Sequence, residues 1–265
     1  MSVISDFQRF LRGNFSILIA GRRKSGKSAL MYRLAEIAYS LRARPVYVVN
    51  LPEQATQILP EWIRPLHRSQ IDKVTDSILL FEESALVAFS RSWYSTFNKL
   101  LSKLNAIAFH KRQSHIYVVQ NMSLLDRNVI SMIDVLMLKE YNYVQYKLER
   151  EELREIVGTA AVMLRQIPPS ERVKYAVVIG LYDYPPFLFE YKLASFWKEE
   201  LAYAWEKYSF ESERVEASTL TEQIERLVVE GKAKSWKDLK PYFPQTKDQT
   251  LRVLFRRVKK RLAEA

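Results

Sequence analysis

Residues 15–42 constrain the fold more than any other part of the chain. A short apolar run, FSILIA (15–20), stops at Gly21, and the segment GRRKSGKS (21–28) begins there. After Ser28, apolar residues recur at helical spacing as far as Leu41. A continuous apolar run of this length is typical of a strand buried in a parallel sheet. The sequence therefore predicts a buried strand, a tight turn with two glycines and a helix in direct succession.

The turn fits the pattern G-x-x-x-x-G-K-[ST] of a phosphate-binding loop. Gly21 and Gly26 let the backbone turn its N–H groups inward, and the positive end of the following helix points to the same place. We expect Lys27 to contact the β- and γ-phosphates of ATP and Ser28 to coordinate Mg²⁺. The residues expected to line the nucleotide are Gly21, Arg22, Arg23, Lys24, Ser25, Gly26, Lys27, Ser28 and Ala29. For the three cations among them, plain solvation is the alternative.

Two acidic residues, Glu82 and Glu83, end a second apolar run at 78–81. The carboxyl ends of parallel strands border the crevice in which open α/β sheets bind ligands. We assign Glu82 to the metal, through a metal-bound water, and Glu83 to the orientation of the attacking water. The alternative is that both acids cap the helix that follows, which its dipole favours.

A third apolar run, 115–120, ends in Gln120, whose amide can sense the γ-phosphate and hold the water. The predicted catalytic residues are therefore Lys27, Glu83 and Gln120, with a loop-closing role as the alternative for the glutamine. The segments 44–50 and 134–141 are two further strand candidates, the second with Lys139 near its end. No T-K-x-D motif is present, so guanine specificity is not indicated.

In this order, the segments resemble the HerA/FtsK superfamily of P-loop ATPases, which includes archaeal viral and plasmid packaging motors. The resemblance covers roughly residues 14–145, and its most discriminating part is HIYVVQ followed by a loop, a helix and DVLMLK. It implies an α/β fold of the RecA-like (ASCE) P-loop NTPase type, with a mostly parallel sheet flanked by helices. It also implies ATP hydrolysis coupled to DNA movement in a ring hexamer, with an arginine supplied by the neighbouring subunit. The chain departs from the family at Glu82, where an Asp is usual.

Arg112 and Arg127 are the candidates for that arginine, and pairing with a surface acid is the alternative for each. Further along, residues 93–104 and 146–167 have helical periodicity. The runs YAVVIG (175–180) and FLFEY (187–191) predict a β-hairpin that extends the sheet antiparallel, and a helix is expected over 195–208. We therefore place the ATPase domain at residues 1–208.

The last part of the chain predicts a small helical domain. Residues 209–218 are polar and are interpreted as a linker. Three helical segments follow within a helix-turn-helix-like domain at 219–265. Gly231 is expected to end the first helix, and Ser235 with Asp238 to cap the second, which runs to about Pro244.

The charge of the chain is concentrated in this small domain. The whole chain has a formal net charge of +11, and eleven Lys or Arg residues against two Asp residues lie between Lys232 and Arg261. Such an excess favours a nucleic-acid partner, and we expect DNA, bound mainly through its phosphates. The predicted DNA-facing residues of the third helix are Lys247, Gln249, Arg252 and Arg256. The alternative is a solvated helical bundle that docks on the ATPase domain or on a neighbouring subunit.

Composition excludes several other classes of protein. Cysteine is absent, so neither a disulfide framework nor a thiolate metal site exists, and the three histidines show no ligand spacing. The apolar runs are too short to span a bilayer, and the first residues are too polar for a signal peptide. We therefore expect a cytoplasmic protein, in the host cytoplasm if viral, with no membrane partner.

The sequence favours an ATP-hydrolysing DNA motor that translocates, packages or remodels DNA as a homo-oligomer. The alternative is a nucleotide-switched DNA-binding regulator or a partition-type ATPase. A small-molecule kinase is a third possibility. The adjacent acids Glu82 and Glu83 argue against it, because they suit water as the nucleophile, and no arginine-rich lid follows.

Overall fold

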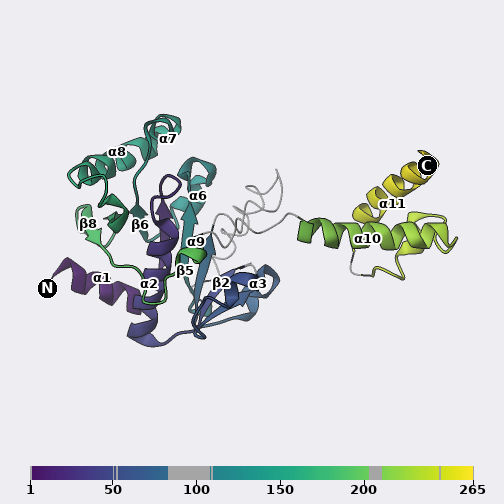
Figure 1. The fold of residues 1–265 in the computed structure, drawn as a ribbon, viewed down its shortest axis with the longest axis horizontal. Coiled ribbons are helices and arrows are strands. Elements are labelled where there is room, and N and C mark those ends of the chain that lie inside the picture. The colour runs from purple at the N-terminus through teal and green to yellow at the C-terminus, as the bar shows by residue number, and fades with distance from the viewer. Residues whose placement is uncertain are drawn as a thin grey trace. The chain divides into compact units, whose positions relative to one another are not determined.

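The computed structural model describes residues 2–49, 51, 53–82, 108, 110–202, 211–244 and 246–264. The chain divides into two compact units, Met1–Lys207 and Tyr208–Ala265 (Figure 1). The division falls next to the predicted domain boundary at residue 208.

The first unit is built on one sheet of eight strands, in the order β3-β2-β4-β5-β1-β6-β7-β8. The first six strands of this order are parallel, and β7 and β8 continue the sheet antiparallel. The mostly parallel sheet and its antiparallel hairpin are thus as predicted. The strands are β1 (Ser16–Ala20), β2 (Val46–Val49), β3 (Ile63–Leu66), β4 (Ile78–Glu82), β5 (Ser114–Val119), β6 (Val135–Leu138), β7 (Tyr175–Ile179) and β8 (Phe187–Glu190).

The central strands are apolar at nearly every position because helices cover both faces of the sheet. Ile17 and Ile19 of β1 belong to the core under α1 (Val3–Arg12) and α2 (Lys27–Arg42). Leu18, between them, belongs to the opposite core, under α6 (Arg127–Ile130) and α8 (Glu151–Arg165). Figure 1 shows α2 crossing the sheet, with α7 and α8 near the β6–β8 side. The shorter elements are α3 (Glu53–Thr56), η1 (Arg68–Lys73), η2 (Met122–Leu124), α7 (Tyr143–Leu148), η3 (Arg172–Lys174) and α9 (Glu199–Ala202).

The predicted helix at 146–167 is wrong as a single element, because the chain forms α7 and α8 with an extended break at Glu149 and Arg150. Asn142 and Gln145 form a capping box that starts α7 upstream of the predicted position. At the break, the Arg150 guanidinium donates to the carbonyls of Met122 and Leu125. This contact with the loop after β5 fixes the turn between the two helices.

The helix expected over 195–208 also begins later, at Glu199. Ser195 donates its backbone N–H and its hydroxyl to Glu36 of α2, which holds this segment against α2 before a helix starts. Residues 203–208 lie outside the described residues, as does most of the helix expected from about Trp93.

The second unit contains α10 (Glu211–Val229), the turn η4 (Trp236–Leu239) and α11 (Asp248–Glu264). Gly231 ends the first helix in a left-handed conformation, φ +70°, and Ser235 and Asp238 form a capping box, both as predicted. A small core closes the unit, with Ile224, Leu251 and Val258 fully buried.

Two expectations for this unit are wrong. Residues 211–218, interpreted as part of a linker, form the first turns of α10. They contain no Gly or Pro, and their Glu, Arg and Ala residues are good helix formers despite their polarity. The second predicted helix is a single 3₁₀ turn, because Pro241 lies just past its C-cap, Lys240, and lacks the N–H that a helix interior needs.

None of the described helices is both long enough and apolar enough to cross a membrane.

Candidate nucleotide-binding site

The loop 21–26 joins the carboxyl end of β1 to the first turn of α2. Gly26 is the N-cap of α2 and has φ +85°. A Cβ atom at this position would lie 2.9 Å from both Tyr191 Oη and Val173 Cγ2, so only glycine fits the turn. The N-terminus of α2 therefore opens directly onto the loop, where the helix dipole favours an anion.

Lys27 lies inside this turn. Its side chain is buried, and Nζ donates to the carbonyl oxygens of Gly21 and Arg22, each at 2.9 Å. The ammonium is therefore held within the loop rather than in solvent. This is where a phosphate-binding lysine is needed.

The two predicted metal ligands are in contact. Ser28, in the first turn of α2, donates its hydroxyl to Oε1 of Glu82, the last residue of β4. Hydroxyl and carboxylate oxygens are the hard donors that Mg²⁺ prefers. Across the described residues, no group of three or more His, Cys, Asp or Glu is arranged so that it could hold a metal ion. A metal at this pair would thus take its other ligands from water and phosphate, as Mg²⁺ commonly does.

The side chain of Tyr32, one turn further along α2, is also buried. Burial first, and then the charge of Glu82, raise the pKa of Tyr32 well above its usual value. Its hydroxyl stays protonated at any physiological pH, so Tyr32 adds no second negative charge near Glu82.

Gln120 follows β5 directly, on the strand next to β1. Its Oε1 accepts a hydrogen bond from Nε of Arg23 at 3.0 Å, which places the predicted sensor residue beside the loop. Its carbonyl oxygen accepts from Nε2 of Gln145 at 3.3 Å. Glu83, the predicted water-orienting residue, lies outside the described residues.

Arg22 is not simply solvated. Its Nε and one terminal nitrogen lie 3.0 and 2.7 Å from Oε2 of Glu140, and Arg172 lies 3.1 Å from Oε1 of the same carboxylate. Burial alone would raise the pKa of Glu140, but the hydrogen bonds from the two arginines bring it below its usual value. The Arg22 amide also donates to the Glu140 carbonyl at 2.8 Å, so it is turned away from the inside of the loop. The sequence pattern did not single out Glu140 or Arg172.

The remaining loop residues differ in their surroundings. Lys24 adopts a left-handed φ of +60°, and Ala29 is buried under the first turn of α2. Ser25 is buried too, and no hydrogen-bond partner within the described part of the chain reaches its hydroxyl. A buried hydroxyl without a partner is costly, and a phosphate oxygen would remove that cost. The loop therefore fits a bound phosphate chain.

The two candidate arginines are both exposed. Arg127 forms an ion pair with Glu152, which is the alternative that the sequence left open. Arg112 has φ +52°, and its carbonyl oxygen accepts from the buried Arg44 at 3.4 Å.

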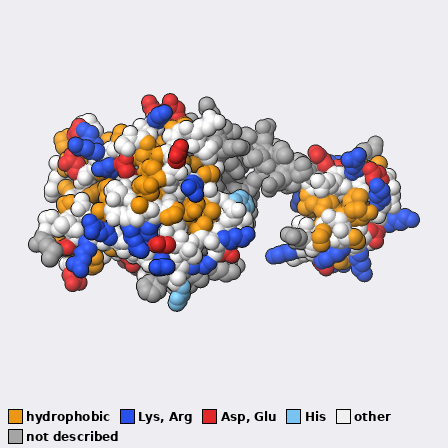
Figure 2. All heavy atoms as spheres, turned by 90° about the horizontal axis from the view of Figure 1, so that it is seen from below, with side chains coloured by type: hydrophobic (Ala, Val, Ile, Leu, Met, Phe, Trp, Pro, Cys, Tyr) orange, Lys and Arg blue, Asp and Glu red, His pale blue; other side chains and the backbone are white. Residues whose placement is uncertain are grey.

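In the second unit, all four predicted DNA-facing residues of the α11 region are exposed. The Arg252 guanidinium lies over the Trp236 ring, 5.7 Å from its centre. Figure 2 shows Lys and Arg side chains around an apolar centre on the visible face of this unit. The four predicted DNA-facing residues are Lys247, Gln249, Arg252 and Arg256.

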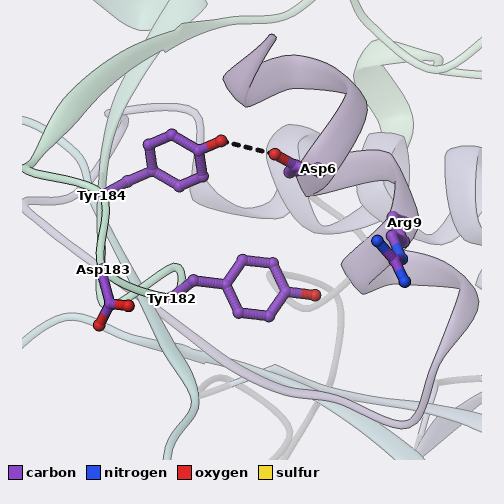
Figure 3. Close-up of a pocket in the computed structure, with 5 residues that line it drawn as sticks. All are labelled: Asp6, Arg9, Tyr182, Asp183 and Tyr184. Atoms are coloured by element: carbon purple, nitrogen blue, oxygen red, sulfur yellow. Dashed lines mark hydrogen bonds between the residues drawn. The ribbon is translucent and has the colours of Figure 1, made fainter. Parts of the chain in front are cut away.

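A separate cavity of about 570 Å³ lies between α1 and the turn that joins β7 to β8 (Figure 3). Asp6 and Arg9 line it from α1, and Tyr182, Asp183 and Tyr184 line it from the turn. None of the predicted site residues contributes to it.

No family model matches the sequence, and no curated protein is significantly similar to it. Solved structures similar to the chain include the DNA-packaging ATPase B204 of Sulfolobus turreted icosahedral virus, with 12% identity over 68% of this chain and 98% of that one, at a TM-score of 0.47. The genome-packaging NTPase B204 of Sulfolobus turreted icosahedral virus 2, in complex with ATP-γS, has 11% identity over the same shares, at 0.48. EssC ATPases 2 and 3 of Geobacillus thermodenitrificans have 11% identity over 73% of this chain and 43% of that one, at 0.47. With every one of these TM-scores below 0.5, the similarities do not assign a function to this chain.

Proposed function

We propose that this chain is a P-loop ATPase of the HerA/FtsK type that hydrolyses ATP to move DNA. The observation that carries the proposal is the contact of Ser28 with Glu82 at the mouth of a loop whose lysine points inward. A glycine turn and a buried lysine alone would bind phosphate. The carboxylate that β4 brings to the serine adds the second requirement of a triphosphate site, a place for Mg²⁺.

Each residue then has a defined role. Lys27 and the amides at the start of α2 would bind the β- and γ-phosphates, and Ser28 with Glu82 would hold the metal. Mg²⁺ bound there would neutralise charge on the phosphate oxygens. Glu83 accepts the proton of the attacking water, and the Gln120 amide positions that water against the γ-phosphorus.

The DNA part of the proposal rests on the second unit. Its net charge of +9 between Lys232 and Arg261 is unusually high for so short a segment, and its basic residues on α11 are exposed. Lys247, Gln249, Arg252 and Arg256 would contact the phosphates of duplex DNA, so binding should weaken steeply with salt. In this account the chain works in the cytoplasm as a homo-oligomer, a ring hexamer in the family's usual form.

A nucleotide-switched DNA-binding regulator is the second candidate. The observation that favours it is that the basic helix belongs to a compact unit with its own core, which could bind DNA without any motor. Slow turnover, with sequence-specific DNA binding that changes with the bound nucleotide, would favour the regulator.

The steady-state ATPase rate of the full chain, with and without duplex DNA at low salt, tests the proposal. We expect DNA to stimulate the rate. Lys27→Ala should remove tight nucleotide binding and activity, whereas Lys192→Ala, which removes an exposed cation after β8, should not. Absence of both DNA binding and stimulation would exclude the motor, and unchanged ATP affinity in Lys27→Ala would exclude the phosphate assignment.

Glu83→Gln separates binding from hydrolysis. The variant should retain bound ATP and lose turnover, because the amide can no longer take the proton of the water. Hydrolysis at the normal rate would move the water-orienting role to another residue, with Glu82 the first to examine.

A further inference from the structure

Lys139 is a buried cation that the proposed chemistry leaves without a role. It follows β6 directly, and only 1% of its surface is exposed. Its Nζ donates to the carbonyls of Val173 and Tyr175, at 2.7 and 2.5 Å, and to Oη of Tyr191 at 3.0 Å. Within the part of the chain that the structure describes, the ammonium is thus hydrogen-bonded by neutral oxygens and by no carboxylate.

The same backbone segment touches the phosphate-binding loop. A Cβ atom at Gly21 would lie 2.7 Å from Cβ of Lys139, so the start of the loop rests on this residue. At the other end of the loop, Oη of Tyr191 lies 2.9 Å from the carbonyl oxygen of Gly26. Lys139 and Tyr191 thus contact both glycines of the loop from the β6–β8 side of the sheet.

Counting donors and acceptors shows what the Tyr191 hydroxyl can bond to in this network. Tyr191 has one hydroxyl proton and two carbonyls in reach, those of Gly26 at 2.9 Å and Val173 at 2.8 Å. The Val173 carbonyl already accepts from Lys139, and Lys139 also donates to the Tyr191 oxygen. The Gly26 carbonyl likewise already accepts one bond, the first of α2, from Leu30, so each of the two carbonyls keeps a lone pair for the Tyr191 proton. With Lys139 protonated, the Tyr191 hydroxyl therefore donates to the carbonyls of Gly26 and Val173 and has no acceptor on Lys139.

We propose that Lys139 and Tyr191 form a positioning pair that fixes the Gly26 peptide and with it the first turn of α2 in the phosphate-binding arrangement. The pair does not touch the nucleotide and acts through the loop. The inference rests on the proposed function in one respect, that the loop binds a nucleoside triphosphate. It identifies the antiparallel hairpin β7–β8 as the support of the loop, because Tyr191 follows β8 directly.

The electrostatic surroundings make the pair sensitive to pH. Burial first, and then the charge of Lys27, lower the pKa of Lys139 to about 7, although the carboxylate of Glu140 raises it. Neutral Lys139 has a lone pair that can accept a hydrogen bond from the Tyr191 hydroxyl. The hydroxyl then no longer donates to the Gly26 carbonyl. The support of the loop should therefore weaken as the pH rises through about 7.

The test compares Tyr191→Phe with a matched variant, Tyr184→Phe, in the full chain. Tyr184 also donates its hydroxyl, to Oδ2 of Asp6, but at the cavity between α1 and the β7–β8 turn (Figure 3). The dissociation constant of ATP-γS with Mg²⁺ is measured at several values between pH 6 and 9. At pH 6 we expect Tyr191→Phe to weaken binding about 3- to 10-fold, the effect of one lost hydrogen bond, and Tyr184→Phe to bind like the original chain.

The pH profile distinguishes positioning by the pair from a general loss of packing. The ratio of the dissociation constants of Tyr191→Phe and the original chain should fall toward one above about pH 7, since the original chain then also loses the hydrogen bond from Tyr191 to the Gly26 carbonyl. A ratio near one at every pH, or a raised ratio that does not change with pH, would overturn the proposal.

Amide hydrogen exchange tests the pair without any nucleotide. The amides of residues 26–28 should exchange about 3- to 10-fold faster in Tyr191→Phe than in Tyr184→Phe at pH 6.5. If the original chain bound no ATP-γS at all, the proposed function would be wrong. The exchange rates of residues 26–28 would still test whether Lys139 and Tyr191 position the loop. Equal exchange in the two variants would overturn it.

Discussion

At the scale of single residues, three cations of the loop GRRKSGKS have different hydrogen-bond partners. Lys27 is bound by carbonyls of the loop, Arg22 by Glu140, and Arg23 by Gln120. Three cations that look alike in the sequence therefore have different partners: carbonyls of the loop, the carboxylate that follows β6, and the amide that follows β5. The sequence predicted that these three cations lie together in the loop. Their different partners depend on the fold and could not be predicted from the sequence.

Lys139 gives a prediction about stability. Its pKa of about 7 lies below the ordinary 10.5 of a lysine, so between these values the unfolded chain binds more protons than the folded one. The free energy of unfolding should therefore rise with pH across this window relative to Lys139→Met, by at most about 5 kcal/mol. Urea unfolding of both proteins at pH 7, 8.5 and 10 measures the difference, and a constant difference would contradict the burial of a titrating ammonium.

At the scale of elements, periodicity predicted those strands that helices cover on both faces. The runs at β1, β2, β4, β5 and β6 are continuous because both sides of each strand are buried. Strand β3 was missed, since Arg64 and Pro65 are exposed within it and an edge strand tolerates both. Helix α1 was missed as well, because only Phe7 and Leu11 of its ten residues are buried.

The candidate site likewise contains residues that the sequence could predict and contacts that it could not. Lys27, Ser28, Glu82 and Gln120 could be found because each stands at a fixed place relative to a strand end or a motif. The contacts of Glu140 with Arg172 and of Lys139 with Tyr191 join segments 32 and 52 residues apart. No local pattern encodes such pairs, since they depend on how the hairpin folds back on β6.

Helix α8 allows a test at this scale. Gly158 lies in its interior at ordinary helical geometry, and a Cβ atom there would meet Tyr146 Cε2 at 3.6 Å, an ordinary contact. Gly158→Ala should therefore stabilise the chain by about 0.5–1 kcal/mol through helix propensity. A urea unfolding curve checks it, and a lower midpoint would mean that α8 packs more tightly against α7 than described.

At the scale of the whole molecule, the basic residues and the candidate nucleotide site belong to different units. Arg252 and Arg256 lie on α11 of the second unit, whereas the loop and its supports lie within Met1–Lys207. Nucleotide affinity and DNA affinity should therefore respond to different substitutions.

The double variant Arg252→Glu, Arg256→Glu tests this separation in the full chain. DNA binding should weaken, and the slope of its logarithm against the logarithm of salt concentration should fall by about 2 in magnitude. ATP-γS affinity without DNA should not change. A matched change at Arg165→Glu, an exposed arginine at the end of α8, should leave both unaffected. An unchanged salt slope in the double variant would place the DNA contacts elsewhere.

The central claim is that Ser28 and Glu82 together form the magnesium side of a triphosphate site. Its most direct test is the dissociation constant of ATP-γS measured with Mg²⁺ and with EDTA, for the original chain, Ser28→Ala and Glu82→Gln. We predict that Mg²⁺ tightens binding to the original chain at least about 10-fold and has little effect on either variant. Ser28→Ala removes the hydroxyl oxygen, and Glu82→Gln replaces the charged carboxylate by a neutral amide. The same Mg²⁺ dependence in all three proteins would contradict the claim.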